Sequence, residues 1–417
     1  MSVLALTNMY PPHHLGGYEL SCWDVLQRWR GAGHRTSVLT TTMRVPGVQQ
    51  PDDADVDRSL QFYWDDHRLV TPPPWRRWGM ERSNQAALAA ALDRVRPDVV
   101  SVWNVGAMSL GLLTTVAERR IPMVLVICDD WPVYAPDMDA WSRMFRGRPR
   151  LARVVRRMGG PAPGPPDLDA VGPACFVSEF TRERARAWTR WRFPCSDVVY
   201  SGIDLADFPL AVATDGAVPG SGPWAWRLLY VGRLDPRKGI ETLLRAMPLL
   251  PQEATLSVVG RGPEDYAGRL RELAAELGIS SRVRFSSGDR AQLRRFYEEA
   301  DVFVFPSEWD EPFGLVPVEA MACAVPVVAT GTGGSAEFLS HEGNCVVYEA
   351  GDAGSLAAAA TRLALDGDLR LRLVEGGLRT ATELSVDRLA EVLEAWHRAA
   401  VDDFRDGRPP SRPVPSG

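Results

Sequence analysis

Two carboxylates eight positions apart, Glu311 and Glu319, lie in the segment of this chain with the greatest chemical content. A carboxylate accepts hydrogen bonds from two neighbouring hydroxyl groups, such as those on a sugar ring or a ribose. Pro317 is tolerated only in the first turn of a helix, so we expect a helix to start near Gly314–Leu315. A helix start offers free N–H groups and the positive end of its dipole, which suits a phosphate. The segment therefore predicts a ligand with a sugar at each end and phosphate between them, which describes a nucleotide sugar.

The only lysine of the chain, Lys238, is the second unusual residue. The chain has 47 basic residues and all the others are arginine, so a lone lysine indicates a position that needs a compact ammonium group. Arg233 and Lys238 follow the apolar run Leu228–Val231, which predicts a strand with a turn and a helix after it. Ligands bind at the carboxyl ends of the strands in such sheets, so we expect both cations at one site. The alternative is a pair of surface cations in salt bridges, which the downstream glutamates disfavour.

The two glutamates belong to a longer pattern, F-P-S-x-W-x-E-P-F-G-L-x-x-x-E-A-M-A, which covers residues 305–322. It resembles the E-x7-E signature of retaining glycosyltransferases with two facing Rossmann-like domains, the GT-B architecture, and most closely glycosyltransferase family four. The resemblance implies that Glu311 contacts hydroxyls of the donor sugar, that Glu319 contacts the ribose, and that the backbone amides after Glu311 meet the diphosphate. It also implies that Arg233 and Lys238 neutralise the diphosphate. The plain alternative is a solvated capping glutamate followed by a helical one.

Further donor contacts are predicted where glycines follow strands. Gly16 and Gly17 stand before a helical pattern and permit close backbone approach or positive φ. In the resembled family this loop reaches the donor phosphates; the alternative is an ordinary strand-to-helix turn. The predicted donor-binding residues are Gly16, Gly17, Gly232, Arg233, Lys238, Gly260, Arg261, Glu311, Phe313, Gly314, Leu315, Val316 and Glu319, and the predicted catalytic residues are Arg233, Lys238, Glu311 and Asp129.

Cys128 and Asp129 follow the apolar run Met123–Ile127. Members of the family often carry His-Asp here, with the histidine beside the transferred sugar. The resemblance thus implies a role for Asp129. Cys128 takes the histidine position, which puts any contact made by a histidine in doubt.

The acceptor is expected on the N-terminal half, where ten of the 14 tryptophans lie. A buried indole N–H must find a partner, so some of these rings should be partly exposed and free to stack on a sugar or a polycyclic aglycone. We expect Trp75 and Trp78, in a proline-rich loop, to contact a soluble small-molecule, natural-product or glycan acceptor. Cys128 and Trp131 are the other predicted acceptor-side residues. The alternative is that these tryptophans serve core and hinge packing.

An arginine-rich segment, Arg143–Arg157, has two possible roles. It contains seven arginines, and the chain has no acidic residue between Asp139 and Asp167. The segment could meet acidic lipid as a peripheral membrane contact, or a phosphorylated acceptor. The alternative is a solvated helical face or a mobile loop.

Alternating strand and helix patterns predict an α/β fold, the 417 residues predict two domains, and the resemblance implies that both are Rossmann-like. We expect an N-terminal acceptor domain at residues 1–204, a linker at 205–225, and a donor domain at 226–390. A helix at 391–407 should cross back to the first domain, before a disordered tail at 408–417. Residues 44–82 are expected to be an irregular insertion. The dinucleotide fingerprint GxGxxG is absent after the first strand, which disfavours a dehydrogenase.

Composition excludes several classes of protein. Apolar residues make up 45% and charged residues 24% of the chain, as in globular proteins, and no run approaches the ~18 apolar residues of a membrane span. The net charge of -6 disfavours general nucleic-acid binding. Six scattered cysteines without a CxxC pair, and a first strand with no basic segment before it, predict a cytoplasmic protein.

The expected chemistry follows from the charge that develops when a nucleoside diphosphate leaves a sugar. Prearranged cations and helix-start amides stabilise that charge. The pairs Asp65-Asp66 and Asp129-Asp130 are adjacent and should point apart, so no metal site and no cofactor are predicted. Retention would come from front-face attack, as proposed for relatives. Three alternatives stay open: a synthase that accepts a sugar phosphate, a glycosyltransferase acting on lipid-linked or cell-surface polysaccharide, and a non-catalytic nucleotide-sugar-binding protein.

Overall fold

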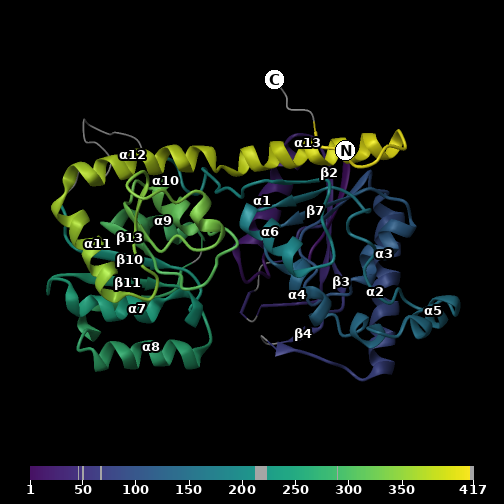
Figure 1. The fold of residues 1–417 in the computed structure, drawn as a ribbon, viewed down its shortest axis with the longest axis horizontal. Coiled ribbons are helices and arrows are strands. Elements are labelled where there is room, and N and C mark those ends of the chain that lie inside the picture. Colours follow the sequence, from purple (N-terminus) through teal and green to yellow (C-terminus); the bar gives the residue numbers. More distant parts are fainter. Residues whose placement is uncertain (46, 49–50, 66–67, 212–222, 289, 414–417) are drawn as a thin grey trace. The chain divides into compact units, whose positions relative to one another are not determined.

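The chain forms two compact units in a computed structural model that describes residues 1–45, 47–48, 51–65, 68–211, 223–288 and 290–413 (Figure 1). Unit 1 comprises Met1–Tyr200 and Leu389–Gly417, and unit 2 comprises Ser201–Arg388. Each unit is built around its own parallel sheet, as expected for a chain too long for one hydrophobic core.

Unit 1 has a seven-stranded sheet in the order β3-β2-β1-β6-β7-β8-β9, and every neighbouring pair is parallel. The central strands are continuous apolar runs because helices cover them on both faces. The strands are β1 (Ser2–Leu6), β2 (Arg35–Thr41), β3 (Val56–Leu60), β6 (Val99–Val102), β7 (Met123–Ile127), β8 (Ala174–Phe176) and β9 (Ser196–Val198), with a separate antiparallel pair, β4 (Trp64–Asp65) and β5 (Arg68–Leu69).

The helices of unit 1 bury two groups of apolar side chains. The larger group lies against the sheet, and a smaller one gathers around Tyr63, Trp141 and Phe145. The helices are α1 (Gly17–Gly31), α2 (Pro74–Val95), α3 (Gly111–Glu118), α4 (Trp131–Met138), the 3-10 helix η1 (Ser142–Phe145), α5 (Pro149–Arg157), α6 (Glu179–Trp188) and most of α13 (Val386–Arg405).

Unit 2 has a six-stranded, fully parallel sheet in the order β12-β11-β10-β13-β14-β15. Its strands are β10 (Arg227–Val231), β11 (Thr255–Val259), β12 (Val283–Ser286), β13 (Val302–Phe305), β14 (Val327–Ala329) and β15 (Cys345–Val347). Apolar residues of β10, β11 and β13 share one core with α7 (Ile240–Ala246), α8 (Glu264–Glu276) and α11 (Ala353–Leu365).

The helices of unit 2 alternate with these strands along the chain, as the sequence predicts. They are η2 (Pro236–Lys238), α7 (Ile240–Ala246), η3 (Met247–Leu249), α8 (Glu264–Glu276), η4 (Ser280–Arg282), α9 (Arg290–Glu299), α10 (Val316–Ala322), η5 (Gly334–Glu337), α11 (Ala353–Leu365) and α12 (Gly367–Glu383).

The prediction that residues 44–82 are irregular is wrong. Strand β3 adds to the sheet beside β2, and helix α2 begins at Pro74. The strand is half polar, and it tolerates Arg58 because the guanidinium pairs with Asp52 at 2.5 Å and donates to the carbonyl of Tyr10 at 2.8 Å. The prolines, which indicate a loop by composition, occupy the start of α2, where a missing N–H costs nothing.

Several predicted segments have boundaries that can be compared with the observed units. The unit boundary lies between Tyr200 and Ser201, and α13 runs through the predicted crossing segment, with Leu389–Gly417 assigned to unit 1. Residue 66, residues 212–222 of the predicted linker and residues 414–417 of the predicted tail lie outside the described residues. Within the described ranges, no helix has both the length and the apolar content needed to cross a membrane.

Candidate functional site

The carboxyl edge of the sheet in unit 2 brings together the loops that follow β10, β11 and β13. The first two loops touch closely: Gly232 N–H donates to Val259 O at 3.0 Å, and Leu234 N–H donates to Arg261 O at 2.9 Å. A Cβ on Gly260 would lie 1.8 Å from the carbonyl oxygen of Gly232, so only glycine fits there. The glycines predicted to follow these strands therefore set how closely the loops approach.

Lys238 and Glu311, which are 73 positions apart in sequence, form the central ion pair of this edge. The ammonium Nζ lies 2.5 Å from Oε1 of Glu311, and the Ser307 hydroxyl donates to the same oxygen at 2.7 Å. Only 5% of Glu311 is exposed, and its other oxygen, Oε2, has no partner among the described residues. Oε2 is therefore the oxygen that can accept a hydrogen bond from a bound hydroxyl group.

The loop that carries Glu311 is held by the segment after β14. Gly334 N–H donates to Glu311 O at 2.6 Å, and the Thr332 hydroxyl donates to Trp309 O at 2.8 Å. Gly333 has φ 60 and ψ -139, and a Cβ there would lie 2.6 Å from Glu311 O. A glycine is thus required at this contact, which fixes the backbone of Glu311.

The turn after Glu311 leads into α10 as the sequence predicts. Gly314 adopts φ 94, Leu315 caps the helix, and Pro317 lies in its first turn, which confirms the predicted helix start. A Cβ on Gly314 would also lie 3.0 Å from the Phe305 ring. Backbone amides of this turn follow Glu311 directly in the chain.

Glu319, in the first turn of α10, is bound by a buried tyrosine. The hydroxyl of Tyr297 donates to Oε2 of Glu319 at 2.8 Å, and the tyrosine is fully buried. Burial and the nearby carboxylate raise the pKa of Tyr297 well above its ordinary value, so it stays a donor. Tyr297 therefore holds Glu319 in one orientation.

The two arginines near Lys238 have different surroundings. Arg237 forms an ion pair with Asp235 at 2.7 Å and stacks over the ring of Trp309, 4.7 Å from its centroid. Its hydrogen bond lowers the pKa of Asp235 to about 2, so this pair remains charged. Arg233, in contrast, is exposed and has no ion pair with any described carboxylate. Arg233 is thus the arginine available to a bound anion, and exposed Arg261 lies on the adjoining loop.

In unit 1, the predicted Gly16–Gly17 loop forms the start of α1. Gly16 is the N-cap residue with φ -144 and ψ -175, so neither glycine needs a positive φ here. The carboxylate of Glu19 folds back over this helix start and accepts from Leu15 N–H at 3.4 Å. Burial raises the pKa of Glu19 to about 7, against the effect of the backbone N–H groups. A Cβ on Gly16 would lie 3.1 Å from Oε2 of Glu19, so the glycine leaves room for this carboxylate.

Asp129 lies at the end of β7 within a set of polar side chains. Its Oδ2 accepts from Asn104 Nδ2 at 2.9 Å and from the Tyr134 hydroxyl at 2.7 Å, and its Oδ1 accepts from Trp131 N–H at 3.0 Å. Burial raises the pKa of Asp129 to about 6, although these hydrogen bonds oppose the rise. Cys128, beside it, is half-buried. The structure thus places Asp129 at the carboxyl edge of this sheet, next to the end of β6.

The predicted acceptor-side tryptophans lie in three different environments. Trp75 is 77% exposed in the first turn of α2, which is a helix rather than the expected loop. Trp78 is half-buried and packs edge-on against Trp141, with ring centroids 5.8 Å apart. Trp131 is buried in the main core of unit 1. Of the three, Trp75 is the most exposed.

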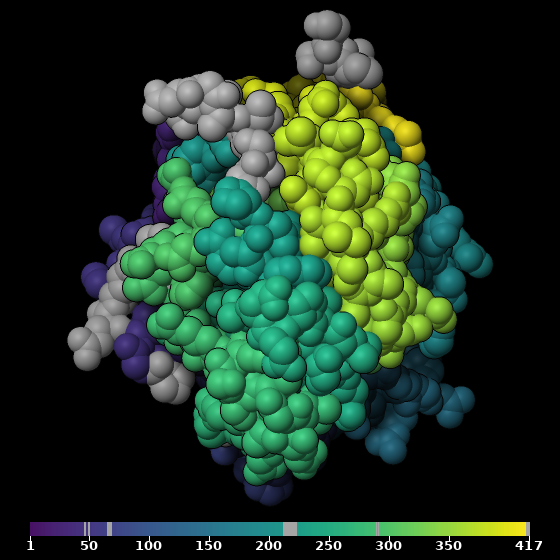
Figure 2. Space-filling model, turned by 90° about the vertical axis from the view of Figure 1, so that its left-hand side faces the viewer, coloured from purple at the N-terminus to yellow at the C-terminus, as the bar shows by residue number. Residues whose placement is uncertain are grey.

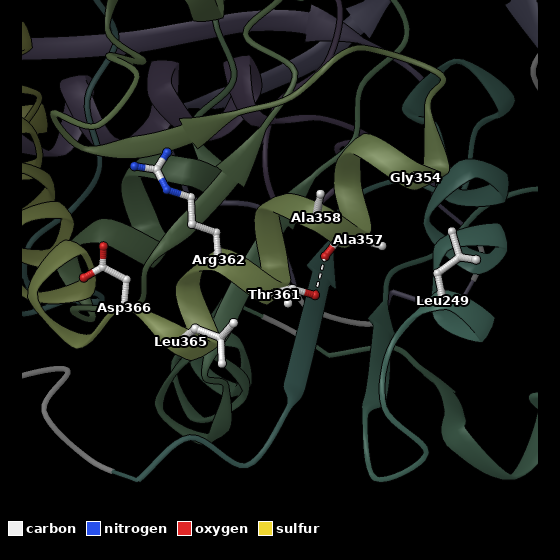
Figure 3. A pocket seen from close by; sticks show the side chains of 8 residues that line it. All are labelled: Leu249, Gly354, Ala357, Ala358, Thr361, Arg362, Leu365 and Asp366. Atoms are coloured by element: carbon white, nitrogen blue, oxygen red, sulfur yellow. Dashed lines mark hydrogen bonds between the residues drawn. The ribbon is translucent and has the colours of Figure 1, made fainter.

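A groove on α11 in unit 2 lies apart from these residues. It has a volume of ≈ 650 Å³ and is lined mainly by one face of that helix and by Leu249 of η3 (Figure 3). In Figure 2 the yellow-green surface of α11 and α12 borders the teal-to-green surface of α7 and α8. The groove contains none of the predicted site residues and no carboxylate pair, so it is not the candidate site.

Four residues of the candidate sites are not among the site residues predicted from the sequence: Ser307, Tyr297, Asn104 and Tyr134. Ser307 lies inside the quoted pattern, where its position before Glu311 was a usable signal. Tyr297, Asn104 and Tyr134 carry no such signal, because other elements bring them to their carboxylates. Within the described part of the chain, no three His, Cys, Asp or Glu residues are grouped so that they could hold a metal ion.

Comparisons with known proteins cover almost the whole chain. The family model described as Glycosyl transferases group 1 matches residues 222–380, and the one described as Glycosyltransferase Family 4 matches residues 15–207. An uncharacterized glycosyltransferase of Methanocaldococcus jannaschii is 33% identical over 426 residues, which cover 96% of this chain and 99% of the relative. A D-inositol 3-phosphate glycosyltransferase of Thermomonospora curvata is 40% identical over 216 residues, but this match covers 48% of this chain and 47% of the relative.

Solved structures share the fold at low sequence identity. Sucrose-phosphate synthase from Thermosynechococcus elongatus matches with a TM-score of 0.70 and 21% identity, over 95% of this chain and 98% of that one. HepE of Anabaena, in complex with UDP and glucose, matches with a TM-score of 0.65 and 20% identity, over 94% and 98% of the two chains. The two parallel sheets are those of the GT-B fold.

Proposed function

Because this chain belongs to the glycosyltransferases of group 1 and family 4, we propose that it transfers a sugar with retention from a nucleoside diphosphate to a hydroxyl group. The donor is a nucleotide sugar, and the acceptor is a small molecule, natural product or glycan. The UDP and glucose bound to HepE support a donor of this chemical class.

One observation carries the proposal: Lys238 and Ser307 both bind Oε1 of Glu311, and no residue that the structure describes binds Oε2. The carboxylate is nearly buried and its orientation is fixed by both ends of its loop. A preorganised acceptor of hydrogen bonds beside an ammonium group suits a sugar hydroxyl next to a phosphate. In this role Glu311 binds the donor sugar rather than attacking its anomeric carbon.

The cations of this edge would stabilise the leaving group. As the glycosidic bond breaks, negative charge develops on the β-phosphate, and preorganised donors lower the free energy of that state. Lys238 and the exposed Arg233 supply positive charge, and the amides of the Gly314 turn supply N–H groups. We propose that these groups act without a metal ion or cofactor, so transfer should persist in excess EDTA. Complete loss of activity that Mg²⁺ restores would contradict this.

Glu319 would bind the ribose of the same donor. Its first-turn position and its hydrogen bond from Tyr297 fix the carboxylate about one helical turn from the Gly314 turn. Vicinal ribose hydroxyls pair with a carboxylate of fixed orientation. The two glutamates then bind opposite ends of one ligand, as their spacing in sequence predicts.

The acceptor would meet unit 1, where Trp75 presents an exposed ring. A second candidate acceptor is a sugar or polyol phosphate, and the partial similarity to a D-inositol 3-phosphate glycosyltransferase favours testing it. Replacement of Trp75 by alanine should raise the acceptor KM and leave the donor KM unchanged if the ring stacks on the acceptor. A rise in the donor KM instead would contradict the assignment.

The experiment that tests the function has two stages. A thermal-shift panel of nucleotide sugars identifies the donor, because a ligand at 100 times its Kd stabilises the native state by ~2.7 kcal/mol. Release of nucleoside diphosphate is then measured with neutral glycosides, sugar phosphates and inositol phosphate as acceptors. Binding with no release for any acceptor would favour a non-catalytic nucleotide-sugar-binding protein. No binding in the whole panel would overturn the proposed donor class.

A further inference from the structure

Helix α5 leaves a stripe of large apolar side chains exposed. Leu151, Val154 and Met158 follow one another at spacings of three and four residues, which places them on one side of the helix. Their exposed fractions are 42%, 50% and 76%. The helix packs through another side, where Ala152 and Val155 contact the smaller apolar group of unit 1. The exposed stripe is therefore not needed to pack the helix against unit 1.

Arginines line the same helix beside this stripe. Arg150, Arg153 and Arg157 share its spacing, and all three are exposed. In the part of the chain that the structure describes, none of the three pairs with a carboxylate, whereas Arg156 pairs with Glu118. Positive charge thus accumulates on this helix without neutralisation. In Figure 1, α5 projects from unit 1 beyond α2, away from the strands.

We propose that α5 is a docking surface for a bilayer that contains anionic phospholipids. The stripe of Leu151, Val154 and Met158 would enter the boundary between headgroups and acyl chains. The arginines beside it would bind lipid phosphates, for which the planar guanidinium is well suited. The charge is local, because the chain as a whole carries a net charge of -6.

The apolar stripe separates a bilayer from other anionic partners. A soluble phosphorylated acceptor or a nucleic acid would satisfy the arginines but would leave three large apolar side chains in water. A lipid surface would bury the apolar stripe and bind the arginines at the same time. Since α5 is a short helix, the docking should be reversible, should require anionic lipid, and should weaken as salt rises.

The test is co-sedimentation of the full chain with vesicles of phosphatidylcholine alone and of phosphatidylcholine mixed with phosphatidylglycerol. Wild type should bind only the mixed vesicles. The variant R150Q/R153Q/R157Q removes the charges, and the variant L151S/V154S/M158S removes the apolar stripe. Each should bind the mixed vesicles at least tenfold more weakly than wild type. The matched control is R269Q/R271Q/R295Q, which removes the same charge from exposed, ion-paired positions on α8 and α9 and should bind as wild type.

Other outcomes overturn the proposal. Equal binding to both vesicle types, or none to either, excludes an anionic bilayer as the partner. If L151S/V154S/M158S bound as wild type, the apolar side chains would not take part in binding. The arginines would then form a general anion site, for which a soluble phosphorylated ligand is the better partner. A loss in the control equal to that in the arginine variant would show that only total charge matters. Unchanged circular dichroism in the three variants establishes that each is folded.

Discussion

The single lysine of the chain lies against a carboxylate that is nearly sealed from solvent. A buried carboxylate without a cation would be costly, so Lys238 and Ser307 are needed for Glu311 to remain in place without a ligand. Replacing Lys238 by arginine would be unfavourable, because a guanidinium is larger and needs a planar, forked partner. The only lysine of the chain thus lies where a compact ammonium is needed, which is why composition alone predicts a role for Lys238.

Replacement of Lys238 or Glu319 by alanine should each lower kcat by at least ~10²-fold, since each removes a charged contact with the donor. The measurement is steady-state turnover with the identified donor, together with thermal unfolding to establish that the fold persists. Arg269→Ala, at an exposed ion-paired position on α8, is the control and should leave turnover unchanged. Near-normal turnover in both site variants would remove the basis for the donor site.

The raised pKa of Glu19 predicts how the free energy of unfolding depends on pH. Its pKa is raised from an ordinary 4.5 to about 7 by burial, so the folded state binds this proton more tightly than the unfolded state. The resulting stability is fully present below pH ~4.5 and is lost as pH rises through about 7. Glu19→Gln should therefore be more stable relative to wild type at pH 8 than at pH 5, measured by urea unfolding. The exposed control Glu276→Gln should show no such change with pH. A constant difference between wild type and Glu19→Gln would contradict the argument.

The two glutamates are predictable from the sequence because they lie on one loop and one helix turn, eight positions apart. The side chains that bind them are not. Tyr297 lies 22 positions before Glu319, and Asn104 lies 25 positions before Asp129, in the loop after a neighbouring strand. Such contacts depend on the order of strands in the sheet, which periodicity within one segment does not contain.

Among the elements, strands buried on both faces were the easiest to predict. The apolar run Met123–Ile127 matches β7 residue for residue, and the run Leu228–Val231 covers all of β10 except Arg227, because continuous apolar residues mark these strands. Strand β3 was missed, since an edge strand with Asp57 and Arg58 lacks that mark. Its polar side chains are satisfied by ion pairs that a linear reading does not reveal.

The close approach of the loops after β10 and β11 gives a prediction for stability. Gly260→Ala should lower the free energy of unfolding by at least ~2 kcal/mol, because the new Cβ would meet the backbone oxygen of Gly232 at 1.8 Å. The matched control is Gly268→Ala on α8, where a Cβ would meet nothing within 4 Å. That change should raise stability by ~0.5–1 kcal/mol, because alanine favours the helix. Urea unfolding measures both, and a tolerated Gly260→Ala would show that the loops can separate.

For the molecule as a whole, sequence and structure agree on two Rossmann-like sheets and on the GT-B fold. The residues proposed to bind the donor are readable from the sequence because they lie on loops at one edge of one sheet. The residues that would bind the acceptor are not, because a surface for an unknown hydroxyl compound has no fixed pattern of residues. Trp75 and Trp78 illustrate this: three positions apart in sequence, one ring faces solvent and the other packs against Trp141.

The anomeric outcome tests the reaction as a whole. A donor with an α-linked sugar should give an α-linked product, because front-face attack within the ion pair keeps the configuration. Proton coupling constants of the product decide this. A clean β-linkage would contradict retention while leaving the donor site intact, and the Lys238 variant would then still be impaired.

Helix α13 has a consequence for how the protein is made. The indole N–H of Trp29 donates to Ala390 O at 3.0 Å, and its ring packs edge-on against buried His397, so the first helix of the chain is completed by the last. At ~5–20 residues per second, a ribosome synthesises Trp29 roughly 20–70 s before it synthesises α13. Unit 2 is continuous from Ser201 to Arg388 and is fully synthesised first. The ring of Trp29 therefore stays without its α13 contacts until the last helix has been made, so the N-terminal unit cannot complete its packing during the synthesis of unit 2.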